Sequence, residues 1–418
     1  MKSLRRIVAI VLGLLLLLAM SPTPTATAHK KGSVDGAVVE DWNAIAVRTI
    51  FVENPTPIPL GQLYFGFASS AVYDAVRKAG RVNGRHRRDR ASVAAAVAAA
   101  AYGVLVEYLP LSAAALADDL EDTLADVPDG RREDRGVAIG EAAAEEIIEE
   151  RVGDGRNAAI TLDVTPGPGV WRPTPPANLP MALPWFGFVE PLLLDSPTQI
   201  ELDGPPDLDS RQYAREFIEE KAVGELDSTV RTAAQTATAH FWNANATLQF
   251  QDAMRDLSDR EDMSAREAAK MYAAINLTTA DALIACWRAK YDFAFWRPIT
   301  AIHEAESDDN PRTTADPDWT PLIPTPPYPD YPSGHACLTG SVATGLADLA
   351  GSDDIDLYVK SVHNGVETTR HFTGAKKMIR EAFNARIWLG IHFRTAMEDG
   401  SRIGKKSSRI GFEELDIG

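Results

Sequence analysis

The sequence predicts an almost entirely α-helical protein with two helical halves. Apolar residues recur at helical spacing through most of the chain. The two long interruptions of that spacing are rich in proline, which suits neither helix nor sheet. A length of 418 residues with 45% apolar side chains is enough for a large buried core.

The first residues have the anatomy of a secretory signal peptide. A basic start precedes an apolar run at residues 7–20, and Ala26-Thr27-Ala28 supplies a small-residue cleavage motif. We therefore predict that residues 1–28 are removed before His29 and that the protein is secreted or periplasmic. The alternative is an uncleaved membrane anchor, but the apolar run falls short of the about 20 residues that a membrane span needs. No membrane span is expected after that cleavage.

The N-terminal helical half, residues 29–164, is rich in Ala, Leu, Val and Glu at helical spacing. Helices are expected there at residues 40–53, 64–80, 91–106, 115–127 and 136–153. Residues 165–209 then form a proline-rich ordered connector, which Trp171, Trp185 and Phe186 should hold against the protein.

The second helical half, residues 210–418, is expected to carry the functional site. A second proline-rich loop covers residues 316–332. Helical patterns occur at residues 210–224, 230–257, 264–296, 335–349, 353–358 and 375–389.

The charge of the chain excludes some classes of partner. The formal net charge is −17, and it becomes −20 once the three basic residues of the signal peptide are removed. Such a field disfavours nucleic acid and anionic membrane surfaces, so a basic anion-binding cluster must act locally. Cys286 and Cys337 are too few for a disulfide scaffold; one bridge and two separate buried thiols both fit the sequence.

Three short segments of the second half concentrate groups that bind an oxyanion. In the first, Lys290 and Arg297 are seven residues apart, so both can project from one helical face. Pro298 should leave Arg297 near a helix end, where its guanidinium can turn toward a ligand. The alternative is a pair of solvated charges, but the aromatic residues around them argue against it.

The second segment, Pro332-Ser333-Gly334-His335, lies between a proline-rich loop and a helical run. This pattern predicts a helix N-terminus, whose free N–H groups bind anions. Gly334 permits close approach of the backbone, Ser333 adds a hydroxyl and His335 adds a titratable nitrogen. An ordinary helix cap with an incidental histidine is the alternative interpretation.

The third segment places Arg386 six residues before His392. By itself, His392 between Ile391 and Phe393 would suit a buried core residue. Combined, the three segments supply three fixed positive charges and two histidines, which is the set needed for in-line displacement at a phosphate-like centre.

These residues resemble the signature of the vanadium-dependent haloperoxidases and the type-2 phosphatidic acid phosphatase superfamily. The blocks are Lys, six residues, Arg-Pro; then Pro-Ser-Gly-His; then Arg, five residues, His. Stretches such as EDWNAIAVRTI, GVWRPTPP, AHFWNANA and GIHFRTAMEDG are similar to the soluble bacterial branch related to vanadium chloroperoxidase. The resemblance covers nearly the whole chain after residue 28.

The resemblance implies an all-α fold with two helical bundles and vanadate as the cofactor, with phosphate able to occupy the same site. It implies that His392 binds the vanadium, that His335 contacts the apical hydroxyl and that Lys290 polarises peroxide. The equatorial oxygens would be held by Lys290, Arg297, Ser333, Gly334 and Arg386. The substrates would be hydrogen peroxide and halide, with an organic acceptor left open.

The resemblance also implies a halide side lined by Trp287 and Tyr328. Both residues are aromatic, but the tyrosine hydroxyl favours bromide or iodide, with chloride as a further candidate. Ala396 stands where many members carry aspartate, and Ala385 where serine is common. Asp399 or Glu398 is expected to orient His392 in place of that aspartate.

Two other functions use the same residues. The first is a soluble acid phosphatase in which His392 forms a phosphohistidine and His335 protonates the leaving group. The second is an oxyanion-binding helical protein without catalytic activity.

Overall fold

The computed structural model describes residues 34–85 and 90–415, so the predicted signal peptide lies outside the described residues. Over this part of the chain the architecture is helical, with a single two-stranded sheet, which confirms the predicted fold class. No helix in the described ranges is both long and apolar enough to cross a membrane.

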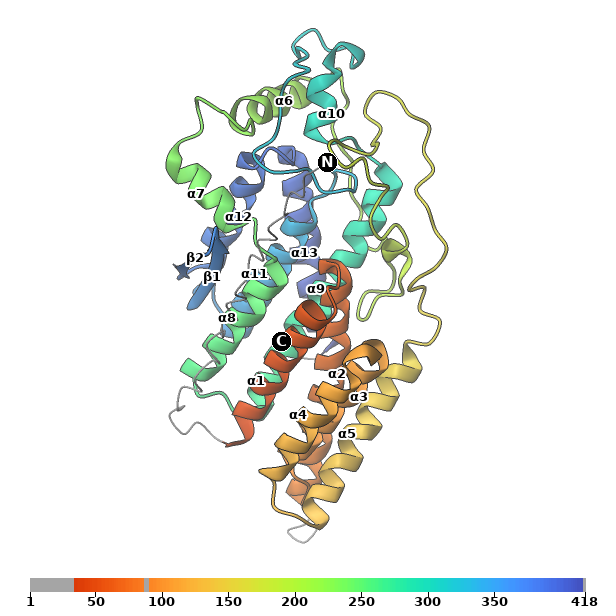
Figure 1. Cartoon of the computed structure of the whole chain (residues 1–418), viewed down its shortest axis with the longest axis vertical. Helices are drawn as coiled ribbons and strands as arrows, with labels where there is room; N and C mark the ends of the chain where they lie inside the picture. Colours follow the sequence, from red (N-terminus) through yellow and green to blue (C-terminus); the bar gives the residue numbers. More distant parts are fainter. Residues whose placement is uncertain (1–33, 86–89, 416–418) are drawn as a thin grey trace, which may run out of the picture.

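The N-terminal helices form a bundle at one end of an elongated molecule (Figure 1). Its helices are α1 (Val34–Val47), α2 (Ile58–Arg85), α3 (Val93–Tyr108), α4 (Ala113–Ala125) and α5 (Arg131–Glu150), with a π-helical turn at Arg48–Glu53 and a 3₁₀ turn at Pro110–Ser112. The alanine-rich α3 packs closely on α5, because a Cβ added at Gly140 would collide with the carbonyl oxygen of Ala96. Small residues thus let the two backbones touch.

The second half contains the remaining elements. They are α6 (Arg211–Val223), α7 (Ala233–Phe241), α8 (Ala246–Arg260), α9 (Ala265–Phe293), α10 (Pro298–His303), α11 (Gly334–Ala350), β1 (Leu357–His363), β2 (Val366–Phe372), α12 (Ala375–Trp388) and α13 (Arg394–Glu414), with 3₁₀ turns at Phe186–Phe188 and Ala305–Ser307.

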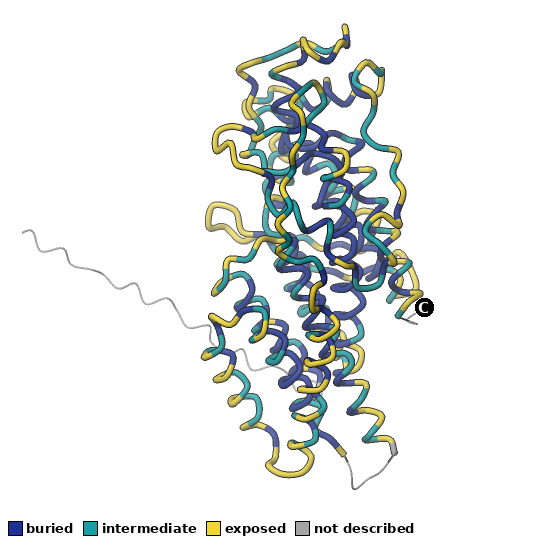
Figure 2. The backbone as a smooth tube through the Cα atoms, turned by 90° about the vertical axis from the view of Figure 1, so that its right-hand side faces the viewer, coloured by how far each residue is buried: buried dark blue, intermediate teal, exposed yellow. Residues whose placement is uncertain are grey.

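Helix α9 is the shared axis of the two bundles, since it packs against α1 and α2 on one side and α11 and α13 on the other. Within the helix, the buried Asn276 accepts hydrogen bonds from Gln62 of α2 and Gln251 of α8 and donates one to Ser69. Figure 2 shows buried backbone through the middle of the molecule, while loops and outer faces are exposed.

The connector between α5 and α6 is attached to α9 by a buried carboxylate. Asp281 accepts hydrogen bonds from the backbone N–H groups of Leu192, Leu193 and Leu194 at 2.7, 2.7 and 2.8 Å. Burial nevertheless raises the pKa of Asp281 to about 6. The same helix carries Lys290, so this attachment also fixes the connector relative to the predicted site.

Replacing Asp281 with alanine should reduce the free energy of unfolding by about 2–4 kcal/mol, because three backbone N–H groups lose their acceptor. The Asp281→Asn variant would keep one carbonyl acceptor, so a smaller loss is expected. Urea unfolding of the two variants beside the wild type measures both losses. Equal stability of all three proteins would contradict the assignment.

Two predicted helices were wrong. The expected helix at 230–257 is divided into α7 and α8, because Asn245 caps α8 by accepting from the N–H of Leu248. The expected helix at 353–358 is replaced by the start of a β-hairpin, in which Asn364 and Gly365 adopt positive φ in the tight turn between β1 and β2.

Helix α13 was not predicted at all, although it spans 21 residues. Its buried face mixes the large apolar residues Met397, Ile403 and Phe412 with small ones, which include Gly400, Ser401, Gly404 and Ser408. A Cβ added at Gly404 would collide with the carbonyl oxygen of Cys337, so α13 packs directly on the first turn of α11. These small residues therefore bring α13 into contact with the start of α11, which carries part of the predicted site.

Candidate active site

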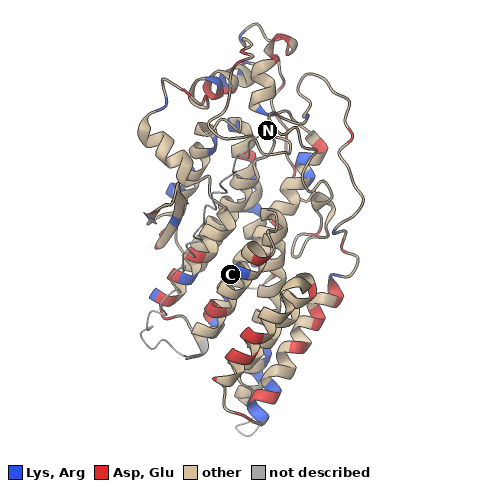
Figure 3. Cartoon of the chain, viewed as in Figure 1, with Lys and Arg blue, Asp and Glu red and all other residues tan. Residues whose placement is uncertain are grey.

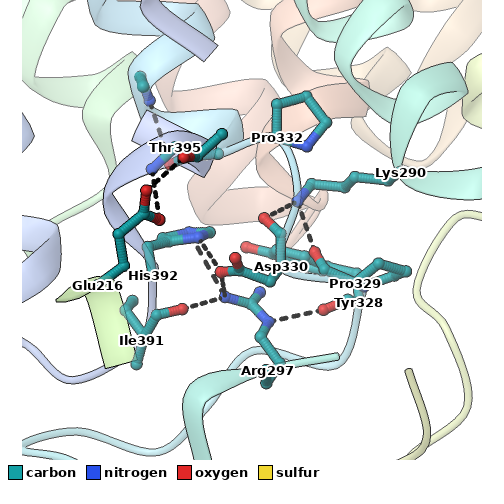
Figure 4. A network of polar contacts seen from close by, with 12 residues as sticks. Glu216, Lys290, Arg297, Tyr328, Pro329, Asp330, Pro332, Ile391, His392 and Thr395 are labelled. Atoms are coloured by element: carbon teal, nitrogen blue, oxygen red, sulfur yellow. Dashed lines mark hydrogen bonds and ion pairs between the residues drawn. The ribbon is translucent and has the colours of Figure 1, made fainter. Parts of the chain in front are cut away.

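The three predicted segments meet at one place in the second half of the chain (Figure 4). Lys290 lies on the last turn of α9, which ends where Ala294 takes a left-handed conformation. Arg297 is the N-cap of α10, directly before Pro298. Ser333 is the N-cap of α11, and His392 follows α12 in a short loop.

The local chain explains how the last segment is placed. Gly390 has a φ of +80°, and a Cβ there would collide with the carbonyl oxygen of Gly224. Thr395, just after His392, donates its N–H to Glu216 of α6 at 3.0 Å (Figure 4). The loop that carries His392 is therefore fixed at both ends.

Three buried cations surround the site. Arg297 donates to the carbonyl oxygens of Tyr328 at 2.7 Å and Ile391 at 2.6 Å. Lys290 donates to the carbonyl oxygens of Pro329 at 2.6 Å and Asp330 at 3.1 Å, and burial lowers its pKa to about 8.

The third cation, Arg386, donates from Nη1 to the carbonyl oxygen of Trp242 at 3.2 Å. Burial lowers the pKa of Arg386 to about 10. The break between α7 and α8 contributes to this contact. Because α7 ends just before Trp242, the carbonyl of Trp242 can accept from the Arg386 guanidinium.

His392 is held by Asp330, a carboxylate outside the three predicted segments. Its Nδ1 lies 2.7 Å from Oδ1 of Asp330, and its Nε2 lies 3.4 Å from Nη1 of Arg297. Because a guanidinium only donates, Nε2 must accept, and the proton is on Nδ1. Burial, reinforced by the nearby cations, keeps the pKa of His392 well below its usual value. A neutral imidazole thus presents the Nε2 lone pair to the site.

The expected orienting residues lie elsewhere. Asp399 accepts from the hydroxyl of Tyr331 at 2.5 Å and pairs with Arg402 at 2.9 Å. Glu398 is exposed on α13. The prediction that Asp399 or Glu398 orients His392 is therefore wrong, and Asp330 takes that position. An acidic residue in the proline-rich loop just before Pro332-Ser333 was the available signal.

His335 reaches the same space from the first turn of α11. Its Nε2 is buried without a hydrogen-bond partner in the described structure, and its ring packs edge-on against Trp242 with centroids 6.1 Å apart. Burial, with a contribution from Arg386, keeps the pKa of His335 well below its usual value. His335 and His392 are close enough to interact electrostatically. The site therefore contains two neutral imidazoles.

The backbone around Ser333 has little spare room. The Ser333 hydroxyl accepts from the N–H of Ala336 at 3.4 Å, and the Ser333 N–H donates to the carbonyl of Ala396 at 2.8 Å. A Cβ on Gly334 would lie 2.8 Å from the ring of Trp287. Glycine is required at this position because any side chain would meet that indole.

Trp287 and Tyr328 form an aromatic wall, with ring centroids 5.2 Å apart. The ammonium of Lys290 lies 5.7 Å from the Trp287 ring and 4.9 Å from the Tyr328 ring. Arg297 also lies over Tyr328, at 4.9 Å. The two residues predicted for the halide side are thus together beside the cations.

The donor set fits an oxyanion such as vanadate or phosphate. Arg297 Nη2 and Arg386 Nε are buried donors without a partner in the described structure, as is the Nε2 of His335. Among described residues, no group of three or more His, Cys, Asp or Glu could hold a bare metal ion. The arrangement therefore suits a ligand that brings its own oxygens.

Asp330 is the carboxylate at the centre of this cluster, 3.9 Å from Arg297. Burial raises the pKa of Asp330 to about 7, while Arg297 and Lys290 act in the opposite direction by favouring the carboxylate. One carboxylate among three cations leaves the local charge positive. Figure 3 shows acidic residues gathered instead on α4 and α5, in the other bundle.

Glu220 of α6 is a further buried carboxyl behind this site. It is 1% exposed, and among the described residues its side-chain oxygens receive no side-chain hydrogen bond, the backbone of His392 being the one group on this loop that favours its ionised form. Burial raises its pKa well above the usual value, and Asp330 and Glu219 raise it further. We expect Glu220 to be a neutral acid in the folded protein at neutral pH.

This shift predicts a pH-dependent stability difference. A group whose pKa is raised in the folded state stabilises the protein at pH values below its pKa in the unfolded state. That contribution is lost as pH rises through the pKa of the group in the folded state. Glu220→Gln is always neutral, so its melting temperature relative to wild type should increase between about pH 5 and pH 9. Glu141→Gln, which neutralises an exposed glutamate on α5 in the other bundle, is the control and should show no such increase. A constant difference for Glu220→Gln would contradict the assignment.

The comparisons with known proteins agree with this fold. Residues 270–415 match the family model of the VCPO second helical-bundle domain. A stretch of 184 residues is 29% identical to vanadium chloroperoxidase of Curvularia inaequalis; it covers 33% of this chain and 29% of that protein. The chain thus matches less than a third of that relative's length.

Solved structures extend the likeness to the whole fold. The crystal structure of the first bacterial vanadium-dependent iodoperoxidase superposes with a TM-score of 0.77 at 22% identity, covering 93% of this chain and 98% of that one. The holo form of a bacterial vanadium-dependent chloroperoxidase gives a TM-score of 0.69 at 16% identity, covering 93% and 96%. The described chain therefore has the fold of these vanadium-dependent peroxidases, and residues 270–415 match the VCPO second helical-bundle domain in sequence.

Proposed function

We propose that this protein is a vanadium-dependent haloperoxidase that uses hydrogen peroxide to oxidise halide to hypohalous acid. The observation that carries the proposal is the neutral His392, whose Nε2 accepts from Nη1 of Arg297 in a site where Arg297 Nη2 and Arg386 Nε are buried donors without partners among the described residues. Such a nitrogen can ligate a metal centre, while the cations hold the oxygens around it.

Each residue then has a separate task. Vanadate, when bound, supplies a Lewis-acidic centre that activates peroxide for oxygen transfer. His392 binds through Nε2, and Asp330 keeps the imidazole in the required tautomer. Arg297, Arg386 and Lys290 offset the charge of the oxyanion.

His335 moves the proton in this proposal. Its Nε2 has no partner in the described structure, and its lowered pKa leaves it able to accept a proton from peroxide that enters the site. Lys290 donates N–H groups near the same space. Both residues act on the substrate rather than on the binding of the oxyanion.

The aromatic wall is the proposed halide side. Trp287 and Tyr328 exclude water next to Lys290, which favours a weakly hydrated anion. The polar hydroxyl of Tyr328 favours bromide or iodide over chloride. We also propose export from the cytoplasm, on the strength of the signal-peptide anatomy at residues 1–28.

A phosphatase is the second candidate. A neutral His392 next to arginine donors is also the arrangement needed for a phosphohistidine, since phosphate and vanadate share shape and charge. An oxyanion-binding protein without activity is the third.

One experiment separates the three functions. Phosphate-free protein is titrated with orthovanadate and assayed for peroxide-dependent bromination of a phenol, beside hydrolysis of an aryl phosphate without vanadate. We expect bromination that saturates with vanadate. Phosphate release without bromination would establish the phosphatase, and oxyanion binding without either activity would establish the binding protein.

A further inference from the structure

Two buried thiols lie directly beneath the proposed oxyanion site. Cys286 is on α9, one helical turn before Lys290, and Cys337 is on α11, one turn after Ser333. Both are fully buried, and both are free thiols. Neither side chain has a task in the proposed reaction.

The two thiols interact with each other and differ in character. Cys286 Sγ donates to the carbonyl oxygen of Pro332 at 3.5 Å. Burial opposes ionisation of both thiols, but the hydrogen bond between them, with Lys290 and Arg297, lowers the pKa of Cys286. The pKa of Cys337 is raised well above its usual value by burial and by that same hydrogen bond. Cys286 is therefore the better nucleophile of the pair.

Cys286 also lies next to the first turn of α11, which carries part of the proposed site. A Cβ placed on Gly334, in the first turn of α11, would lie 4.0 Å from Cys286 Sγ. The thiol therefore lies close to the backbone of that turn. Hydrogen peroxide is small and uncharged, and it is the oxidant that the proposed function already requires. The pair therefore supplies a nucleophilic thiol and a second thiol, and the proposed function supplies the oxidant.

We propose that Cys286 and Cys337 are a peroxide-sensitive pair that forms a disulfide between α9 and α11. The Cys286 thiolate attacks one peroxide oxygen, the O–O bond breaks, and a sulfenic acid and water are formed after protonation. The Cys337 sulfur then attacks that sulfur, the S–O bond breaks, and the proton of the Cys337 thiol leaves with the departing hydroxide as a second water. One peroxide is reduced to two waters while two thiols are oxidised to one disulfide.

The disulfide would join the two helices that carry Lys290 and Ser333. It would also remove the S–H donor that Cys286 presents to Pro332. The proposal goes beyond the halide reaction, because it needs neither vanadate nor halide.

The test uses vanadate-free, full-length protein treated with graded hydrogen peroxide. Thiols are alkylated in denaturant, counted, and mapped by non-reducing peptide mass analysis. We expect the free thiols to disappear together and a Cys286–Cys337 peptide to appear within one chain. Persistence of both thiols, or a bridge only between chains, would overturn the proposal.

Two single variants test the order of the steps. Cys337→Ser should trap a sulfenic acid on Cys286 that reacts with a dimedone probe, whereas Cys286→Ser should leave Cys337 reduced. Equal labelling of the two variants would show that Cys286 is not the attacking thiol and would overturn the assignment. The peptide map of the wild-type protein gives a result even where a variant fails to fold. Because vanadate and halide are absent, this outcome is independent of the bromination assay.

Discussion

His392→Ala is expected to lower the affinity for orthovanadate by at least about a hundredfold, beyond the roughly 10- to 100-fold typical of losing an outer-shell partner. The Nε2 lone pair is the group that can form a coordinate bond, whereas Lys290, Arg297 and Arg386 are cations that can only donate hydrogen bonds. Phosphate needs charge and hydrogen bonds alone, so its affinity should fall much less. Calorimetric titration of phosphate-free protein with each anion measures the two affinities.

The control for this result is His335→Ala. His335 is proposed to move a proton rather than to bind the vanadium, so this variant should retain most of its vanadate affinity and lose bromination. His392 is 2% exposed, so its removal can affect folding. His392→Gln and the melting temperature of each variant separate folding from binding. Unchanged vanadate affinity in both folded His392 variants would exclude His392 as the ligand.

The main helices were predictable because their buried faces carry large apolar residues at helical spacing. Helix α13 was not predicted, although Met397, Ile403 and Phe412 lie on its buried face, because glycine and serine occupy many of the other buried positions where it approaches α11 closely. The β-hairpin was predictable in principle. Asn364-Gly365 between alternating residues is a strong hairpin signal, and Leu357, Val359 and Ser361 are the buried positions of β1.

The oxyanion residues were predictable because each block of the motif is local in sequence. Lys290 and Arg297 are at a helix end, and Ser333 to His335 begin a helix, as expected from Pro298 and from Ser333 as a cap. Partners that depend on the tertiary path of a loop were not predictable in the same way. Asp330 is 62 residues from His392 in sequence and meets it only because the proline-rich loop passes between α9 and the loop after α12.

Asp330→Asn should separate the effect of charge from the effect of orientation. Asp330 accepts from Nδ1 of His392 and so leaves Nε2 unprotonated. Asparagine can instead donate to Nδ1, which moves the proton to Nε2 and blocks its lone pair. Vanadate affinity and kcat for bromination should each fall by about 10- to 100-fold. Loss of a buried negative charge next to Arg297 should at the same time hold or raise the affinity for phosphate.

Opposite changes for the two anions are the signature of a positioning residue, because a purely electrostatic effect of Asp330 would move both affinities in the same direction. Asp399→Asn is the matched control, since Asp399 lies on Tyr331 and Arg402 and should leave both affinities unchanged. A parallel rise for vanadate and phosphate in Asp330→Asn would show that Asp330 acts through charge alone. If Asp399→Asn lost as much vanadate affinity as Asp330→Asn, Asp399 would be the residue that orients His392, as the sequence had indicated. The expected result instead shows that Asp330, a carboxylate in the proline-rich loop, maintains the basicity of Nε2 of His392. The position of that loop then affects the chemistry of the site.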